Sequence, residues 1–187
     1  MDLLIVIHPS KNINHVHNFN LLIGDEGLVY GINQTECRLM IVSSELLPKV
    51  RSIVSQLPTV QTIVYISNSQ IGSQPNTDTF PNNVSLLSLQ ELERVGTNQP
   101  NVDFQIPREE NPVLIMYTSG TTGTPKAAIA THRQLIAGSA NALLVLVKDL
   151  LPEAKKHTYV AYLPLAHVLE LTIELFLFYG KLQKLSF

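Results

Sequence analysis

The chain has 187 residues, of which 45% are hydrophobic, and its net charge at pH 7 is −2. It is long enough and apolar enough for one sizeable core, which excludes a disordered chain, and it has no basic run of the kind that binds nucleic acid. Cys37 is the single cysteine and cannot form an internal disulfide, so we expect a small buried side chain in a protein of a reducing compartment.

The chain begins with a short apolar run at residues 3–7. This run is too short for a signal peptide and follows Asp2 instead of a basic residue, so we expect a strand that enters the core. His8, His15 and His17 follow in an Asn-rich stretch. Because no acidic residue or cysteine stands at a ligand spacing from them, we predict a solvated loop and no metal site.

From residue 24 onward, helical and strand patterns alternate, and Ser44 is a candidate N-cap. Strands are expected at residues 38–42, 61–66 and 84–87, and helices at residues 25–32, 44–57 and 88–95. Short separations between strand and helix are typical of parallel α/β units. Residues 67–83 are rich in Ser, Asn, Pro and Gly and are predicted to be a loop within one domain.

The most informative stretch follows at residues 113–133. An apolar strand at 113–116 leads into a loop of Thr, Ser and Gly, and a second strand at 127–131 would make that loop the bend of a hairpin. We expect a helix at 134–147 with Thr131 as its cap, and then a buried strand at 158–163.

The loop between these two strands has the chemistry of an anion site. Its hydroxyl groups are donors, its two glycines allow successive backbone N–H groups to point inward, and its lysine supplies a mobile positive charge, which together suit a polyphosphate. The candidate phosphate-binding residues are Thr118, Ser119, Gly120, Thr121, Thr122, Gly123, Thr124, Pro125 and Lys126. An ordinary hairpin loop remains the alternative, and the glycine spacing excludes a P-loop.

Near the end of the chain, His167, Glu170 and Glu174 fall on one face of a predicted helix. The apolar run at 175–179 is far shorter than the roughly 20 residues that a transmembrane helix needs. A carboxylate-bridged metal site would need Glu-x-x-His from more than one helix. The pattern alone therefore favours a solvated or hydrogen-bonded structural stripe.

The decapeptide YTSGTTGTPK at 117–126, followed by THRQL from Thr131, resembles the phosphate-binding signature of the adenylate-forming (AMP-binding) superfamily. YLPLAHVLEL at 162–171 and the stretch at 24–50 are similar to the long-chain acyl-CoA synthetase branch, and the resemblance covers residues 22–180. One position differs, because the family usually has glycine where this chain has Ala127. That alanine is strained only if its φ is positive.

The resemblance implies an α/β fold with a mostly parallel sheet and flanking helices, in which residues 1–187 form part of the N-terminal domain. It implies ATP-dependent activation of a fatty acid through an acyl-adenylate to acyl-CoA, with ATP, Mg²⁺ and CoA required. The signature would hold the β- and γ-phosphates, and His167 would lie at the acyl-substrate end. The catalytic residues are not identified. The family also suggests the endoplasmic reticulum, the mitochondrial outer membrane or the peroxisomal membrane as locations, although the chain shows no anchor.

Several motifs of such ligases do not occur in the sequence, namely the adenine-stacking aromatic-Gly-x-Thr-Glu stretch, the ribose-binding aspartate and the C-terminal catalytic lysine. We therefore expect this chain alone not to form acyl-CoA. Two alternatives stay open: a non-catalytic remnant or isoform, and a member of the superfamily that acts on another carboxylate.

Overall fold

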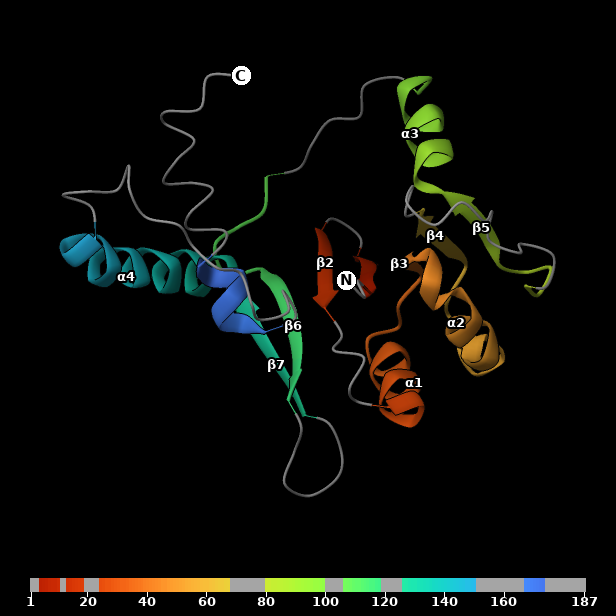
Figure 1. Cartoon of the computed structure of the whole chain (residues 1–187), viewed down its shortest axis with the longest axis horizontal. Coiled ribbons are helices and arrows are strands. Elements are labelled where there is room, and N and C mark those ends of the chain that lie inside the picture. Colours follow the sequence, from red (N-terminus) through yellow and green to blue (C-terminus); the bar gives the residue numbers. More distant parts are fainter. Residues whose placement is uncertain are drawn as a thin grey trace.

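The computed structural model describes residues 4–10, 13–18, 24–67, 80–99, 106–118, 126–150 and 167–173 (Figure 1). The strands are β1 Leu4–Ser10, β2 Ile13–Asn18, β3 Leu39–Ser43, β4 Thr62–Ile66, β5 Ser85–Ser88, β6 Pro112–Thr118 and β7 Lys126–Thr131. The α-helices are α1 Gly24–Gln34, α2 Leu47–Ile53, α3 Leu89–Thr97 and α4 His132–Leu150, with 3-10 turns at Ser44–Leu46 and Val54–Gln56, and residues 168–173 are also helical.

The described strands form one seven-stranded sheet of order β5-β4-β3-β1-β2-β6-β7. β3, β4 and β5 pair in parallel, as do β2 and β6, whereas β1 is antiparallel to both of its neighbours and β7 is antiparallel to β6. Five of the seven strands, β2 to β6, therefore run in one direction, and β1 and β7 run in the other. This confirms the expected α/β fold with a mostly parallel sheet.

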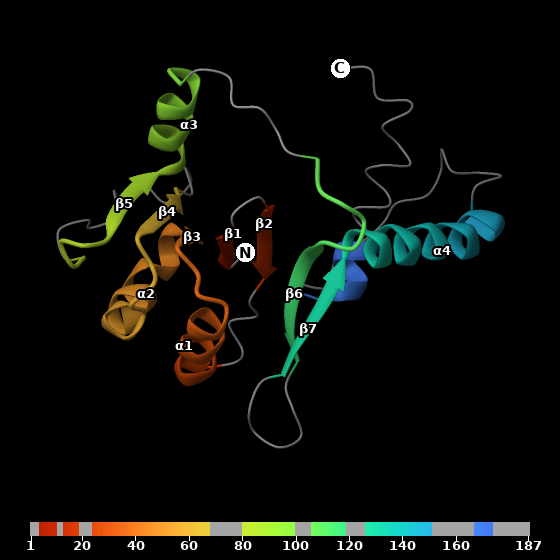
Figure 2. The same cartoon turned by 180° about the vertical axis from the view of Figure 1, so that it is seen from behind.

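The core lies where α1 and α2 cover one face of the sheet. Ile32 of α1, Met40 of β3 and Ile63 of β4 are completely buried, and Val50 of α2 is 2% exposed. Met40 and Val42 are buried while their neighbours along β3 are half-buried, so these two residues mark the face that packs against the helices. In both views α4 lies at the other end of the sheet, beside β6 and β7 (Figures 1 and 2).

Helix α1 has clear signals at both ends. Asp25 and Glu26 lie in its first turn, where negative charge stabilises the helix dipole. After its last turn, Glu36 takes a left-handed conformation with φ 47°, and the Cys37 N–H donates to the Ile32 carbonyl at 3.2 Å. This closing turn directs the chain into β3 and buries Cys37 completely, as expected from the sequence.

Helix α3 also begins as the sequence suggests. The Ser88 hydroxyl accepts from the Glu91 N–H at 3.1 Å, and the Glu91 carboxylate accepts from the Ser88 N–H at 2.8 Å, so the two residues form a capping box. The hydrogen bonds from the backbone and hydroxyl of Ser88 lower the pKa of Glu91.

The predicted cap at Ser44 is wrong. Ser44 opens a 3-10 turn that ends at Leu46, and α2 begins at Leu47 without any side-chain cap. Pro48 explains the change, because its missing N–H and fixed φ suit the first turn of an α-helix and place the helix start there.

The predicted loop around the N-terminal histidines is also wrong. His8 lies in β1 and is paired with His15 of β2, and His17 of β2 is paired with Val6. β1 pairs with β3 along one edge and with β2 along the other. A short hairpin that is marginal by itself is thus stabilised inside a larger sheet.

Three other expectations lie outside the described residues. They are the strand at 158–163, most of the loop at 67–83 and the position of Glu174.

Candidate functional site

The candidate site is built on the hairpin of β6 and β7. The two strands are antiparallel, with Ile115 opposite Ile129 and Thr118 opposite Lys126. Leu114 and Met116 are 4% and 8% exposed, so β6 is held firmly in the sheet. The hairpin predicted from the sequence is therefore confirmed.

The register of this hairpin brings the two ends of the signature together. Directly opposed residues of an antiparallel pair have Cα atoms about 4.5 to 5.5 Å apart, so Thr118 and Lys126 are direct neighbours across the ladder. Of the nine candidate phosphate-binding residues, these two lie in the described strands, and residues 119–125 lie outside them. The site residues between the two ends therefore stay a prediction.

The position of the hairpin in the sheet is informative. β6 runs parallel to β2, and the carboxyl ends of the five parallel-running strands share one edge of the sheet. The signature follows the carboxyl end of β6 and thus begins at this edge. In open α/β sheets, ligands bind outside the carboxyl ends of the strands.

Ala127, where the family usually has glycine, lies inside β7 and is paired with Tyr117. Among the described residues, positive φ values occur only at Gly24 and Glu36. Ala127 therefore has an ordinary extended backbone, and the alanine causes no strain there.

Tyr117 ties the end of β6 to α1. Its hydroxyl lies 2.8 Å from Gln34 Oε1 and 3.2 Å from the Gly31 carbonyl oxygen. Gln34 Nε2 in turn donates to the Tyr30 hydroxyl at 3.2 Å. Burial, with a smaller effect from Tyr30, raises the pKa of Tyr117 to about 12.

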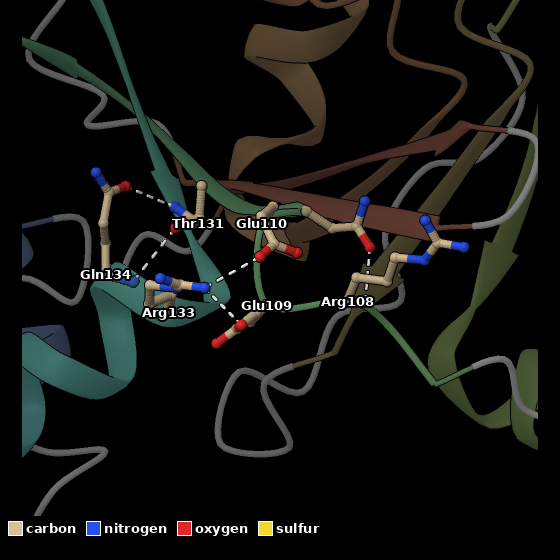
Figure 3. Close-up of polar contacts among 7 residues, drawn as sticks. Arg108, Glu109, Glu110, Thr131, Arg133 and Gln134 are labelled. Atoms are coloured by element: carbon tan, nitrogen blue, oxygen red, sulfur yellow. Dashed lines mark hydrogen bonds and ion pairs between the residues drawn. The ribbon is translucent and has the colours of Figure 1, made fainter.

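A second polar cluster secures the opposite end of the hairpin, where β7 joins α4 (Figure 3). Thr131 and Gln134 exchange hydrogen bonds: Thr131 Oγ1 accepts from the Gln134 N–H at 3.2 Å, and Gln134 Oε1 accepts from the Thr131 N–H at 2.9 Å. This confirms Thr131 as the cap of α4.

In the same cluster, the Arg133 guanidinium donates to the carboxylates of Glu109 and Glu110 (Figure 3). The Glu109 carboxylate is the main cause that raises the pKa of Arg133. The Arg133 N–H also donates to the Glu109 carbonyl at 2.9 Å, so the segment before β6 is held against the first turn of α4.

His167 lies just before the helical residues 168–173 and is exposed. Its Nδ1 accepts from the Leu169 N–H at 3.3 Å, which leaves Nε2 as the ring atom that can face a ligand. Glu170, three residues on, is completely buried. The predicted polar stripe is therefore not uniformly solvated, because one member is exposed and the next is enclosed.

The structure does not bring this helix to the two ends of the signature. In both views residues 168–173 lie beside β6 and the start of α4, toward the end at which β6 begins, whereas the signature follows the other end of β6 (Figures 1 and 2). The assignment of His167 to an acyl-substrate site thus stays a prediction.

Sequence reasoning missed the contact between Tyr117 and Gln34, and also the clamp of Glu109 and Glu110 on Arg133. The two residues of the first contact are 83 positions apart, and those of the clamp are 23 and 24 apart. Periodicity within one helix or strand cannot predict contacts between residues so far apart in the sequence. The only available signal was chemical, namely two adjacent acidic residues and one arginine flanking the same hairpin.

Two kinds of feature do not occur in the described part of the chain. No group of three or more His, Cys, Asp or Glu side chains there is arranged to hold a metal ion. No helix among the described residues has both the length and the apolar character that crossing a membrane requires.

Comparison with known proteins gives a consistent family. The profile of the AMP-binding enzyme family matches residues 15–185. Long chain acyl-CoA synthetase 8 of Arabidopsis thaliana is 35% identical over 156 residues, which are 83% of this chain and 21% of that protein. Long-chain-fatty-acid–CoA ligase 1 of Schizosaccharomyces pombe is 28% identical over 165 residues, or 88% of this chain and 23% of that protein.

Solved structures show the same fold. An anthranilate CoA ligase in complex with anthranoyl-AMP has a TM-score of 0.52 at 27% identity, covering 65% of this chain and 21% of that one. A red-emitting luciferase from Phrixothrix hirtus has a TM-score of 0.56 at 19% identity and covers 87% and 29%, so it supports the fold alone.

The matches differ in how much of each protein they cover. The chain spans about a fifth to a quarter of the length of the curated relatives that it matches, since the covered share is between 21% and 26%. The family profile, in contrast, matches nearly the whole chain. The chain therefore belongs to the AMP-binding enzyme family.

Proposed function

We propose that this chain carries the ATP-phosphate-binding part of a long-chain fatty acid–CoA ligase. The observation that carries the proposal is the register of the hairpin, because it sets Thr118 opposite Lys126 at the carboxyl edge of the parallel strands. The names of the relatives supply the reaction class, since the matched proteins of Arabidopsis thaliana and Schizosaccharomyces pombe are named for long-chain acyl-CoA synthesis.

In the proposed first step, a carboxylate oxygen of the fatty acid attacks the α-phosphorus of ATP. The bond between the α-phosphorus and the bridging oxygen breaks, and pyrophosphate leaves with that electron pair. The signature residues from Thr118 to Lys126 would hold the β- and γ-phosphates, so that hydroxyl and N–H donors stabilise the charge as it develops on pyrophosphate. The thiol of CoA would then displace AMP from the acyl-adenylate.

The same residues fit phosphate better than they fit a metal ion. The ammonium group of Lys126 would repel a divalent cation, and the signature contains no carboxylate or imidazole. Mg²⁺, which the family implies, would therefore be held by phosphate oxygens, and when bound it would neutralise part of their charge.

The identity of the carboxylic acid is proposed from the relatives. Their names favour a long-chain fatty acid, with His167 at the acyl end of the site. The similarity to the anthranilate CoA ligase, at 27% identity, makes an aryl acid the second candidate. We also propose the peroxisome as the place of action, because two relatives are named as peroxisomal, and imaging of a fluorescent fusion would test this.

Calorimetric titration of the 187-residue chain with ATP and with tripolyphosphate tests the phosphate site directly. A charge-assisted contact to phosphate contributes roughly 1.5 to 3 kcal/mol, so Lys126→Ala should weaken binding by about 10- to 150-fold. Arg94→Ala is the matched control, because it removes an exposed positive charge from α3, a helix that contacts β4 and β5. Equal binding by wild type and Lys126→Ala would refute the phosphate role.

The chemistry is tested in a chimera in which the matched part of this chain replaces the corresponding segment, an alignment of 156 residues, of the Arabidopsis synthetase. We expect exchange of pyrophosphate into ATP that depends on palmitate and exceeds the exchange with anthranilate. The reverse preference would select the aryl acid. No exchange with either acid, with ATP binding intact, would leave a binding function for this chain in place of the ligase.

A further inference from the structure

We propose that Gln34 is a positioning residue for the phosphate-binding signature, which it holds through the hydroxyl of Tyr117. This inference rests on the proposed function for its consequence, namely phosphate affinity. The contact itself stands on the geometry: the Tyr117 hydroxyl lies 2.8 Å from Gln34 Oε1, and Tyr117 directly precedes Thr118.

The group that receives this hydrogen bond is itself well fixed. Gln34 is the last residue of α1, and the helix is closed there by the bond from the Cys37 N–H to the Ile32 carbonyl. The Thr35 hydroxyl adds bonds to the Gly31 and Ile32 carbonyls at 2.9 and 3.1 Å. The end of α1 is therefore held by several hydrogen bonds.

A second contact holds the side chain of Gln34 in place. Its Nε2 donates to the Tyr30 hydroxyl at 3.2 Å, one helical turn earlier. The amide thus has a partner on each side, Tyr30 for its donor and Tyr117 for its acceptor. This arrangement orients the acceptor toward β6.

Tyr117 transmits this restraint to the signature. It is half-buried, its ring packs against the core that α1 and α2 cover, and its backbone is paired with Ala127 of β7. Tyr117 is the residue bonded to α1. Thr118 follows it directly in β6, and Lys126 directly precedes its partner Ala127 in β7. Because one residue of a strand spans about 3.3 Å, both ends of the signature lie close to this bond. Fixing the two ends of a phosphate-binding loop before the ligand arrives should raise its affinity, because the loop then loses less conformational entropy on binding.

The arrangement predicts different behaviour for four substitutions. Gln34→Leu removes the nearer of the two acceptors and leaves the Gly31 carbonyl, 3.2 Å from the hydroxyl. Tyr117→Phe removes the donor to both acceptors but keeps the ring. Gln34→Glu keeps an acceptor for Tyr117 and should rescue the function. Tyr30→Phe removes only the outer partner of Gln34 and is the control.

The first measurement is hydrogen exchange by mass spectrometry on the chain without ligand. In Gln34→Leu and Tyr117→Phe, peptides that cover residues 118–126 should exchange roughly 3 to 10 times faster, the factor that corresponds to losing one neutral hydrogen bond. The double variant should exchange no faster than Tyr117→Phe alone. Peptides from β3 and β4 should be unchanged, and Gln34→Glu and Tyr30→Phe should stay within about twofold of wild type.

The second measurement is calorimetric titration of the same proteins with ATP and with tripolyphosphate. We expect Gln34→Leu and Tyr117→Phe to lose affinity by roughly the same 3- to 10-fold factor, with rescue in Gln34→Glu. Exchange at 118–126 that does not respond to Gln34→Leu, or responds equally to Tyr30→Phe, overturns the positioning role. A uniform rise over all peptides also overturns it, because it would mean general loss of stability.

The two measurements separate the inference from the function beneath it. If wild type binds neither ligand, the proposed function fails, while the exchange data still decide whether Gln34 holds Tyr117. If wild type binds and the affinity is the same in all variants, the proposed function stands and Gln34 has no positioning role for phosphate.

Discussion

Replacing Thr131 by alanine tests how the junction between β7 and α4 is stabilised. The Thr131 hydroxyl accepts from the Gln134 N–H at 3.2 Å, and the Gln134 side chain accepts in return from the Thr131 N–H at 2.9 Å. Thr131→Ala removes the first of these bonds and leaves one N–H of the first turn of α4 without its partner.

The magnitude depends on the kind of contact. Loss of an N-cap side chain typically costs about 1 kcal/mol, which in a chain of this size lowers the melting temperature by about 2 to 4 °C. Arg133 offers the competing explanation, because it contacts both Glu109 and Glu110. Its side chain is 60% exposed and those of its partners are 61% and 67% exposed, so water and salt screen these ion pairs. Thr131→Ala should therefore lower stability more than Arg133→Ala does.

Thermal unfolding measured by circular dichroism provides the assay, at low and at high NaCl concentration, about 50 mM and about 500 mM. Thr131→Ser keeps the hydroxyl and should melt close to wild type. The effect of Thr131→Ala should be the same at both salt concentrations, while any effect of Arg133→Ala should shrink at the higher one. A larger loss in Arg133→Ala than in Thr131→Ala would show that the ion pairs, and not the cap, secure this junction.

Buried and capping groups give three further predictions. The pKa of Tyr117 is about 12 in the folded protein and about 10 in the unfolded chain, so the unfolded chain releases this proton at lower pH. The contribution of Tyr117 to stability should therefore be complete below about pH 10 and fall between about pH 10 and 12. Tyr117→Phe should lack this fall, and an identical pH profile would contradict the assignment. Ile63→Ala empties a completely buried site and should cost about 2 to 5 kcal/mol in denaturant unfolding, whereas a loss below about 1 kcal/mol would argue against the core as described. His167→Ala should speed amide exchange at Leu169, while His167→Asn should not because asparagine also caps helices; equal exchange in both would exclude the capping role.

Local patterns were enough to predict the elements that depend on neighbouring residues. A continuous apolar run and the Thr, Ser and Gly loop after it identified β6 and β7 as a hairpin, and a threonine before an apolar helix identified the cap at Thr131. The face of α2 that contacts the core was also predictable from spacing, since Leu47, Val50 and Ile53 are buried. In each case the stabilising contacts lie within a few residues of one another.

Expectations failed where distant partners or competing local signals decide the outcome. The Asn-rich stretch around His15 has no strand pattern of its own. β2 forms because it lies between β1, which pairs with β3, and β6, which comes about 100 residues later. Ser44 looked like a cap, but Pro48 sets the start of α2. For the site, the sequence placed Thr118 and Lys126 at the two ends of one loop, yet it could not indicate that the end of α1 fixes Tyr117, which requires a contact over 83 residues.

The position of β2 in the sheet has a consequence for how the chain folds. β3, β4 and β5 come from one stretch of sequence and β6, β7 and α4 from another, so each set can form from contacts between near neighbours. β2 joins the two sets, and its pairing of Val16 with Leu114 closes a loop of about 100 residues. We expect a loop of this length to close late, because the chain loses the entropy of closing it before the hydrogen bonds between β2 and β6 can stabilise it. We therefore expect the junction between β2 and β6 to form late, and with it the bond between Tyr117 and Gln34, which joins the same two parts of the chain.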